Sequence, residues 1–304
     1  MTRDPRVAPE GAYVTDAADP SRGCGHVIVF HELGPRVGFA GVGVMERNNV
    51  TLSGIVGGQP MLFAHGFGCD QNMWRFVAPA FADEYRIVLF DHVGAGASEL
   101  GAYDRRKYAS LSGYAEDVLE ICHDLELRDV IFVGHSVSAM IGLLAAAEEP
   151  ERFARLVLIG PSPRYVDDGE YVGGFSPDDI DELLQALDAN YLGWSHTYAP
   201  IIMGRGDRPE LGEELTNSFC RTDPQIASHF ARVTFLSDNR GDLARVTTPA
   251  LVLQCSDDVI APDVVGRYVH EHLPDSTFVQ MEATGHCPNL SAPDETIAAI
   301  KAFL

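Results

Sequence analysis

The chain has 304 residues, of which 46% are hydrophobic and 22% are charged, so it contains enough apolar material for a large core. Acidic residues outnumber basic ones 44 to 22, which gives a formal net charge of −22. This composition excludes a collagen-like, low-complexity or disordered chain. Because a polyanion of this size repels phosphate backbones and anionic lipid, we expect neither nucleic acid nor a membrane surface as a partner.

Residues 1–44 differ in composition from the rest, because they are rich in Gly, Pro and Ala and show little hydrophobic periodicity. Their start carries charges and prolines without an apolar segment, which is not typical of a secretory signal. No apolar run approaches the ~18–20 residues that span a bilayer. The six cysteines show no CxxC or metal-ligand spacing. We therefore expect a cytoplasmic protein without metal or cofactor, with residues 1–44 as a poorly structured extension of a domain at residues 45–304.

From Met45 onward, the pattern first predicts a hairpin with Asn48-Asn49 at its turn. Short apolar runs then alternate with longer helical patterns. The runs are continuous rather than alternating, as expected for strands that are buried on both faces. This order of strands and helices predicts an α/β protein whose mostly parallel sheet is flanked by helices. The expected strands are Met61–Ala64, Arg86–Phe90, Asp129–Val133, Leu156–Ile159, Ala250–Gln254 and Thr277–Met281, and the expected helices between them are Trp74–Phe81, Leu111–Leu125, Ser138–Glu148, Ala261–His272 and Pro293–Leu304.

One interval interrupts this alternation. Between Ile159 and Ala250 lie about 90 residues without a buried-strand run. A structureless loop of this length is uncommon in a compact domain, so we expect a helical insertion over one end of the sheet. Its helical patterns are Pro177–Leu192, His196–Met203, Glu210–Ser218 and Pro224–Phe235.

A candidate nucleophile follows the strand at 129–133, where the sequence reads Gly134-His-Ser136-Val-Ser138 before a helix of small residues. A serine on such a strand-to-helix turn presents its hydroxyl at the carboxyl edge of a sheet. The usual motif has Gly at the position of Ser138, and serine is nearly as small. Ser136 is therefore the predicted nucleophile.

A serine needs a base, and the base needs a carboxylate that orients it. Asp258 comes just after the strand at 250–254, and His286 comes just after the strand at 277–281. Both therefore lie at the same sheet edge as Ser136, in the chain order Ser, Asp, His. Asp257 is an alternative carboxylate. We prefer Asp258 for its spacing to Pro262.

A candidate oxyanion site follows the strand at 61–64, in the segment His65-Gly66-Phe67-Gly68. A developing oxyanion requires preorganised N–H donors, each contributing roughly 3–4 kcal/mol in comparable sites. The two glycines allow the loop to turn the Phe67 N–H inward, opposite the N–H of Val137. His65 is expected to support this loop rather than to act as a base.

From Met45 to Leu304 the chain resembles the α/β-hydrolase family, and within it the RsbQ-type bacterial energy-stress regulators and the plant karrikin and strigolactone receptors. The resemblance depends on strings such as HGFGCDQNMW, YRIVLFDHVGAG, VGHSVSAMIG and ATGHCPNLSAPDET. The string GHSVSAMIG is most similar to the plant receptors, which makes Ser138 a subfamily trait.

This resemblance implies an α/β-hydrolase fold with a four-helix cap, at about residues 161–245, inserted after the sixth strand over a mainly apolar pocket. It implies Ser136, Asp258 and His286 as catalytic triad and the N–H groups of Phe67 and Val137 as oxyanion hole. It also implies a substrate-binding wall formed by Tyr165, Trp194, Tyr198 and Phe235.

The sequence thus predicts a serine hydrolase that cleaves a small apolar ester or lactone through an acyl-enzyme. The alternative, implied by the resemblance, is an RsbQ-like stress-signalling sensor that activates a PAS-domain protein phosphatase, with slow or incidental hydrolysis. Perhydrolysis and C–C bond hydrolysis use the same triad, so the sequence leaves both as alternative reactions. Dehalogenation is excluded because Ser136 stands where that chemistry needs Asp.

Overall fold

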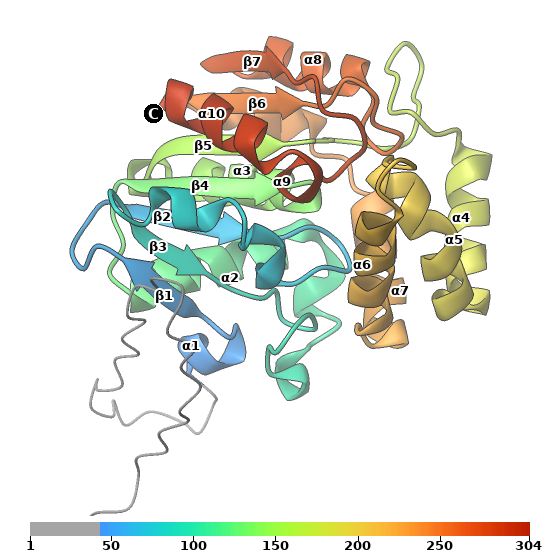
Figure 1. Cartoon of the computed structure of the whole chain (residues 1–304), viewed down its shortest axis with the longest axis horizontal. Helices are drawn as coiled ribbons and strands as arrows, with labels where there is room; N and C mark the ends of the chain where they lie inside the picture. Colours follow the sequence, from blue (N-terminus) through green and yellow to red (C-terminus); the bar gives the residue numbers. More distant parts are fainter. Residues whose placement is uncertain (1–42) are drawn as a thin grey trace, which may run out of the picture. The chain divides into compact units, whose positions relative to one another are not determined.

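A computed structural model of the protein describes residues 43–304. Its strands form one seven-stranded sheet in the order β1-β3-β2-β4-β5-β6-β7, in which β1 runs antiparallel to β3 and the other pairs are parallel. The predicted mostly parallel sheet is therefore confirmed (Figure 1). The strands are β1 (Thr51–Gly54), β2 (Pro60–Ala64), β3 (Arg86–Leu89), β4 (Val130–His135), β5 (Phe153–Ile159), β6 (Ala250–Gln254) and β7 (Ser276–Gln280).

Helices cover both faces of the sheet, which is why its central strands carry mostly apolar residues at successive positions. Alternate residues of one strand enter two separate hydrophobic clusters, as Phe63 and Leu62 of β2 do. One cluster includes α2 (Leu111–Asp124), α3 (Val137–Glu148) and residues of α8 (Asp263–His272). The other includes η1 (Gln71–Trp74), η2 (Ala78–Phe81) and residues of α10 (Pro293–Phe303). Further short helices are η3 (Leu100–Ala102), η4 (Lys107–Ala109), η5 (Pro150–Arg152), η6 (Arg240–Arg245) and α9 (Pro288–Ser291).

Four α-helices lie between β5 and β6 and form the cap. Figure 1 shows them beyond the ends to which the arrows of the parallel strands point. Three of these helices begin with proline, whose missing N–H is not needed in the first turn, and the other begins after an asparagine whose side chain accepts from a main-chain N–H of that turn. The cap helices are α4 (Pro177–Ala189), α5 (Tyr191–Met203), α6 (Pro209–Cys220) and α7 (Pro224–Phe235). Among residues 43–304, no helix is both long and apolar enough to cross a membrane.

The predicted hairpin at Asn48-Asn49 is wrong. Val44–Arg47 forms the short helix α1, and β1 pairs with β3 instead of with a neighbouring hairpin strand. Asn48 is held by distant backbone, because its side chain donates to the main-chain O of Asp91 and its own O accepts from the Asp91 N–H. With one strand in place of two, the cap follows the fifth described strand rather than the sixth.

Two predicted helices also differ from the observed ones. The segment Trp74–Phe81 forms parts of two 3₁₀ helices, η1 and η2, rather than one α-helix. The first cap helix ends at Ala189, because Asn190 leaves helical geometry and accepts a hydrogen bond from the Gly193 N–H to begin α5. The extension predicted at residues 1–44 lies outside the described residues, apart from its last two positions.

The turn from β4 to α3 requires a close approach of strand and helix. Ser136 has φ 57° and ψ −125°, in a region that residues with a side chain rarely adopt. The main chain of Ser138 passes so close to Gly134 that a Cβ there would collide with the Ser138 carbonyl. Gly134 is therefore needed for the turn.

We predict that Gly134→Ala lowers the free energy of unfolding by about 1–3 kcal/mol, because backbone rather than a movable side chain must shift. Chemical denaturation measures this difference. The control is Gly206→Ala, where an added Cβ has no neighbour within 4 Å. Equal stabilities of the two variants would contradict the prediction.

Candidate active site

Three side chains from separate strand ends meet at the carboxyl edge of the sheet. Ser136 follows β4, Asp258 follows β6 and His286 follows β7. His286 Nε2 lies 2.7 Å from Ser136 Oγ, and His286 Nδ1 lies 2.7 Å from Asp258 Oδ2. All three residues are buried. The sheet thus brings a hydroxyl, an imidazole and a carboxylate into one hydrogen-bonded chain.

The environment of Asp258 keeps its carboxylate ionised. Burial alone raises the pKa, but the neighbouring His286 and hydrogen bonds from the N–H groups of Ala261 and Ile260 outweigh it and lower the pKa below the ordinary value. An ionised carboxylate only accepts, so His286 donates from Nδ1 and its Nε2 accepts from the Ser136 hydroxyl. The alternative carboxylate, Asp257, is exposed, and its main-chain O accepts from the Gly285 N–H.

Two main-chain donors adjoin the serine. Val137 is the first residue of α3, and Phe67 lies in the loop after β2 and lines the same cavity as Ser136. Within residues 43–304, no group accepts a hydrogen bond from the N–H of Phe67 or of Val137. The N-terminus of α3 also carries the positive end of the helix dipole, which favours negative charge beside Ser136.

A cavity of only about 30 Å³ opens beside Ser136 and His286. Of the four residues predicted to line it, Tyr165, Trp194 and Phe235 do so. Tyr198 is not among the lining residues, because it lies one turn further along α5 and stacks on Trp194 with ring centroids 5.2 Å apart. Sequence reasoning missed other lining residues, which come mostly from the cap and from loops beside the triad: Cys69, His135, Ile202, Leu215, Phe219, Thr234, Ile260 and Cys287.

Three polar groups of this wall are buried without a partner in the described part of the chain: the Trp194 indole Nε1, the Thr234 hydroxyl and His135 Nδ1. The Tyr165 hydroxyl is a fourth polar group there. Burial raises the pKa of Tyr165, and its proximity to the Ser136 hydroxyl acts in the opposite direction. The otherwise apolar wall therefore offers hydrogen-bonding groups to a ligand.

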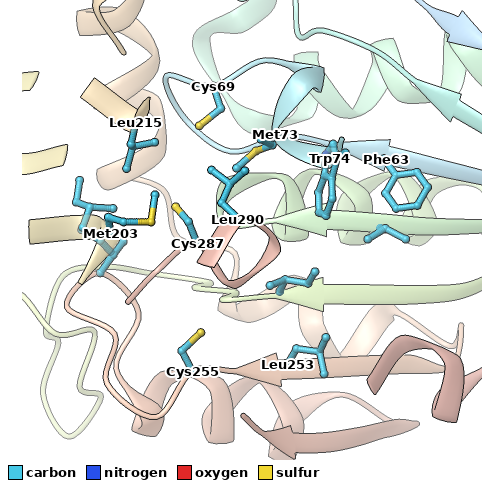
Figure 2. Close-up of a cluster of buried hydrophobic side chains, with 14 of the residues drawn as sticks. Phe63, Cys69, Met73, Trp74, Met203, Leu215, Leu253, Cys255, Cys287 and Leu290 are labelled. Carbon is cyan, nitrogen blue, oxygen red and sulfur yellow. The ribbon is translucent and has the colours of Figure 1, made fainter. Parts of the chain in front are cut away.

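Sulfur atoms form part of the same wall. Figure 2 shows Cys69 and Cys287 with Leu215 between the sheet edge and the cap, and Cys255 at the end of β6. Burial raises the pKa of Cys69 to about 12 and that of Cys287 well above its ordinary value. These thiols are neutral at physiological pH, so they contribute apolar surface rather than nucleophiles.

A second, larger cavity of about 290 Å³ lies between η1 and α6 and shares Cys69 and Leu215 with the first. It contains none of Ser136, His286 and Asp258, so its size does not make it the reaction site. Within residues 43–304, no cluster of three or more His, Cys, Asp or Glu side chains is arranged to hold a metal ion.

Helix α5 ends directly against the loop that carries His286. The His286 N–H donates to the main-chain O of Ile202 over 2.9 Å. Gly204 and Gly285 face each other so closely that a Cβ on either would collide with the opposite backbone. The other side of this loop is held by His135, whose Nε2 lies 2.7 Å from the His286 carbonyl.

His135 is buried beside His286, and burial, followed by the proximity of His286, lowers its pKa to about 3. Because a carbonyl can only accept, His135 donates from Nε2, and its unpartnered Nδ1 carries no proton. This residue was not predicted as part of the site. The only sequence signal for it is its position directly before Ser136.

A family model described as the alpha/beta hydrolase family matches residues 61–299, and the chain belongs to this family. Among curated proteins, it is 38% identical to a karrikin insensitive 2 receptor from Petunia hybrida, over 84% of this chain and 95% of that protein. It is 39% identical to a strigolactone esterase from Arabidopsis thaliana, over 82% of this chain and 93% of that protein. A solved hydrolase from Oleispira antarctica superposes with a TM-score of 0.83 at 41% identity, covering 86% of this chain and 95% of that one.

We predict that His135 makes the fold sensitive to acid. Below pH 6.5 the unfolded chain binds a proton at this histidine, whereas the folded protein does not until about pH 3. Stability therefore falls as pH decreases through this window, by up to ~1.4 kcal/mol per pH unit from this residue. His135→Gln should remove that part of the slope in urea unfolding measured from pH 7.5 to 4.5.

The control is His196→Gln, which changes an exposed histidine and should leave the slope unchanged. If the pH dependence of stability in His135→Gln equalled that of the wild type, His135 would have the same pKa in the folded and unfolded protein. That result would contradict the prediction.

Proposed function

We propose that this member of the α/β-hydrolase family is a serine hydrolase that cleaves small apolar esters or lactones through an acyl-enzyme. The observation that carries the proposal is the hydrogen-bonded chain from Ser136 through His286 to Asp258, which borders a small cavity under the cap. We assign the reaction to the domain at residues 45–304, with residues 1–44 as an extension outside it.

In the first half of the reaction, Ser136 Oγ attacks the carbonyl carbon of the substrate. His286 Nε2 takes the hydroxyl proton as the new C–O bond forms, and Asp258 stabilises the resulting imidazolium. The carbonyl oxygen becomes an oxyanion beside the free N–H groups of Phe67 and Val137. When the tetrahedral intermediate collapses, the ester C–O bond breaks and the leaving oxygen takes the proton from His286.

In the second half, water attacks the acyl-serine and His286 takes one of its protons. The bond to Ser136 then breaks, and the serine oxygen recovers that proton from His286. A lactone follows the same steps, except that the released alcohol stays attached to the acyl group. The sum is hydrolysis of one ester bond by one water.

The cavity supports small substrates over large ones. Its small volume, about 30 Å³, disfavours a long acyl chain, and its wall is mainly aromatic and aliphatic. The unpartnered Trp194 Nε1 and Thr234 hydroxyl favour a compact ligand that also carries a hydrogen-bond acceptor. A short ester or a small lactone has both properties.

A second candidate is a sensor that turns over slowly, as in an RsbQ-like protein that activates a PAS-domain phosphatase from the cytoplasm. Support comes from the relatives, because those from Petunia hybrida are named as receptors although other relatives are named as esterases. An intact triad is compatible with both functions. The rate of turnover and binding to such a phosphatase distinguish them.

We predict that Ser136→Ala abolishes covalent labelling by a fluorophosphonate probe and reduces hydrolysis of p-nitrophenyl acetate by at least 1,000-fold, because no other group replaces the nucleophile. His286→Ala should reduce turnover similarly. The control is Ser291→Ala, which removes another buried serine hydroxyl outside the cavity wall and should label normally. Undiminished labelling of Ser136→Ala would identify a different nucleophile.

We also predict that a panel of short esters, γ-lactones and butenolides yields an acyl adduct on Ser136, detected by mass spectrometry of rapidly quenched protein. A hydrolase gives many turnovers after the adduct forms. A sensor gives one burst equal to the protein concentration and then a slow phase. Absence of any adduct or turnover across the panel would contradict the proposed substrate class.

A further inference from the structure

Ser138 stands where the usual nucleophile motif has glycine, and the reaction described above does not use it. It is the second residue of α3 and is completely buried. A buried hydroxyl needs partners, because an unsatisfied polar group destabilises the folded state. The partners of Ser138 come from two other strand ends.

The direction of each hydrogen bond follows from the chemistry of the groups. Ser138 Oγ lies within hydrogen-bond distance of the His65 carbonyl, which can only accept, so the single hydroxyl proton is used there. His92 Nε2 lies 2.7 Å from the same oxygen and must therefore donate to it. Burial, followed by the nearby His65, lowers the pKa of His92 well below its ordinary value, so this ring is neutral. The proton of His92 is thus fixed on Nε2.

His65 is fixed in the opposite tautomer. The main-chain N–H of His92 donates to His65 Nε2 over 3.1 Å, so that nitrogen carries no proton. His65 Nδ1 therefore carries it and donates to the carbonyl of Gly66 over 2.9 Å. Both the ring and the carbonyl of His65 are consequently held by residues outside its own loop.

These bonds determine where the Phe67 N–H points. The Gly66 carbonyl and the Phe67 N–H belong to one trans peptide unit, in which the two groups point in opposite directions. Fixing the carbonyl against His65 therefore fixes the direction of the N–H. The Ser138 hydroxyl holds the preceding peptide unit by its His65 carbonyl, so both peptide planes of the loop are set.

No other donor can easily replace the hydroxyl. The His92 ring is enclosed by aromatic rings, with centroids of Phe90, Tyr114 and Phe230 at 5.2, 5.6 and 6.2 Å. Both His65 and His92 are buried. With glycine or alanine at position 138, the His65 carbonyl and the His92 Nε2–H would lose their shared partner in a largely apolar environment.

We propose that Ser138 is a positioning residue of this hydrolase: its hydroxyl links the His65 carbonyl to His92 and thereby aims the Phe67 N–H at the developing oxyanion. This proposal rests on the proposed function, since it assigns Phe67 its role in the same reaction. Ser138 itself does not touch the substrate.

The test is Ser138→Ala in the full chain, with p-nitrophenyl acetate as substrate and active sites counted by fluorophosphonate labelling. Because a misdirected donor affects the transition state and not the bound substrate, kcat per labelled site should fall roughly 10- to 100-fold with KM within threefold. Inhibition by a short trifluoromethyl ketone, which forms an oxyanion on Ser136, should weaken by a similar factor. The control is Thr296→Val, which removes a buried hydroxyl of α10 that donates to the carbonyl of Ala292, the residue before this helix, and should leave kcat unchanged.

Two variants of His92 test the same proposal if Ser138→Ala folds poorly. His92→Phe keeps the ring volume and the main-chain donor but removes the Nε2–H, and should lower kcat in the same way. His92→Gln retains a side-chain N–H and should recover part of the loss. A kcat per labelled site within twofold of wild type in both Ser138→Ala and His92→Phe would overturn the proposal, as would an effect confined to KM. If Ser136→Ala retained full hydrolysis, the proposed function itself would fail, whatever Ser138→Ala does.

Discussion

The site depends on one unfavourable backbone conformation. Ser136 has a positive φ, which costs about 1–3 kcal/mol for a residue with a side chain. The surrounding structure offsets this cost, because the Ser136 N–H donates to the Ile159 carbonyl over 2.8 Å and α3 begins at once in a buried position. The sharp turn projects the hydroxyl from the sheet edge and leaves the Val137 N–H without an acceptor among residues 43–304. His286 and Asp258 are then aligned on a serine whose position is already fixed.

The sheet and the meeting of the three side chains were predictable because both follow from short-range patterns and one topological rule. Strands covered on both faces are apolar at successive positions, so β2, β4, β5 and β6 were each found within a few residues. The carboxyl ends of parallel strands share an edge, so residues that follow different strands come together there. The prediction of a hairpin was wrong because the Asn48 side chain is hydrogen-bonded to the main chain of Asp91. This partner is distant in sequence, and no local turn pattern reveals it.

The cavity wall and the supporting hydrogen bonds were less predictable, for two different reasons. In the cap, nearly all faces of α5 carry apolar residues, so spacing alone does not tell that Trp194 faces the cavity whereas Tyr198 stacks behind it. His135 and His92 are single histidines in the sequence, and their tautomers follow only from which neighbour can accept a proton. Such roles depend on three-dimensional contacts between strands that are far apart in the chain.

The contact between α5 and the loop of His286 joins the cap to the imidazole that is hydrogen-bonded to Ser136. The two glycines, Gly204 and Gly285, leave no space between the helix end and the loop, and the hydrogen bond to Ile202 runs across the same contact. Because this contact is tight, the end of α5 and the main chain of His286 move together. The position of the His286 imidazole relative to the Ser136 hydroxyl is therefore linked to the position of the cap.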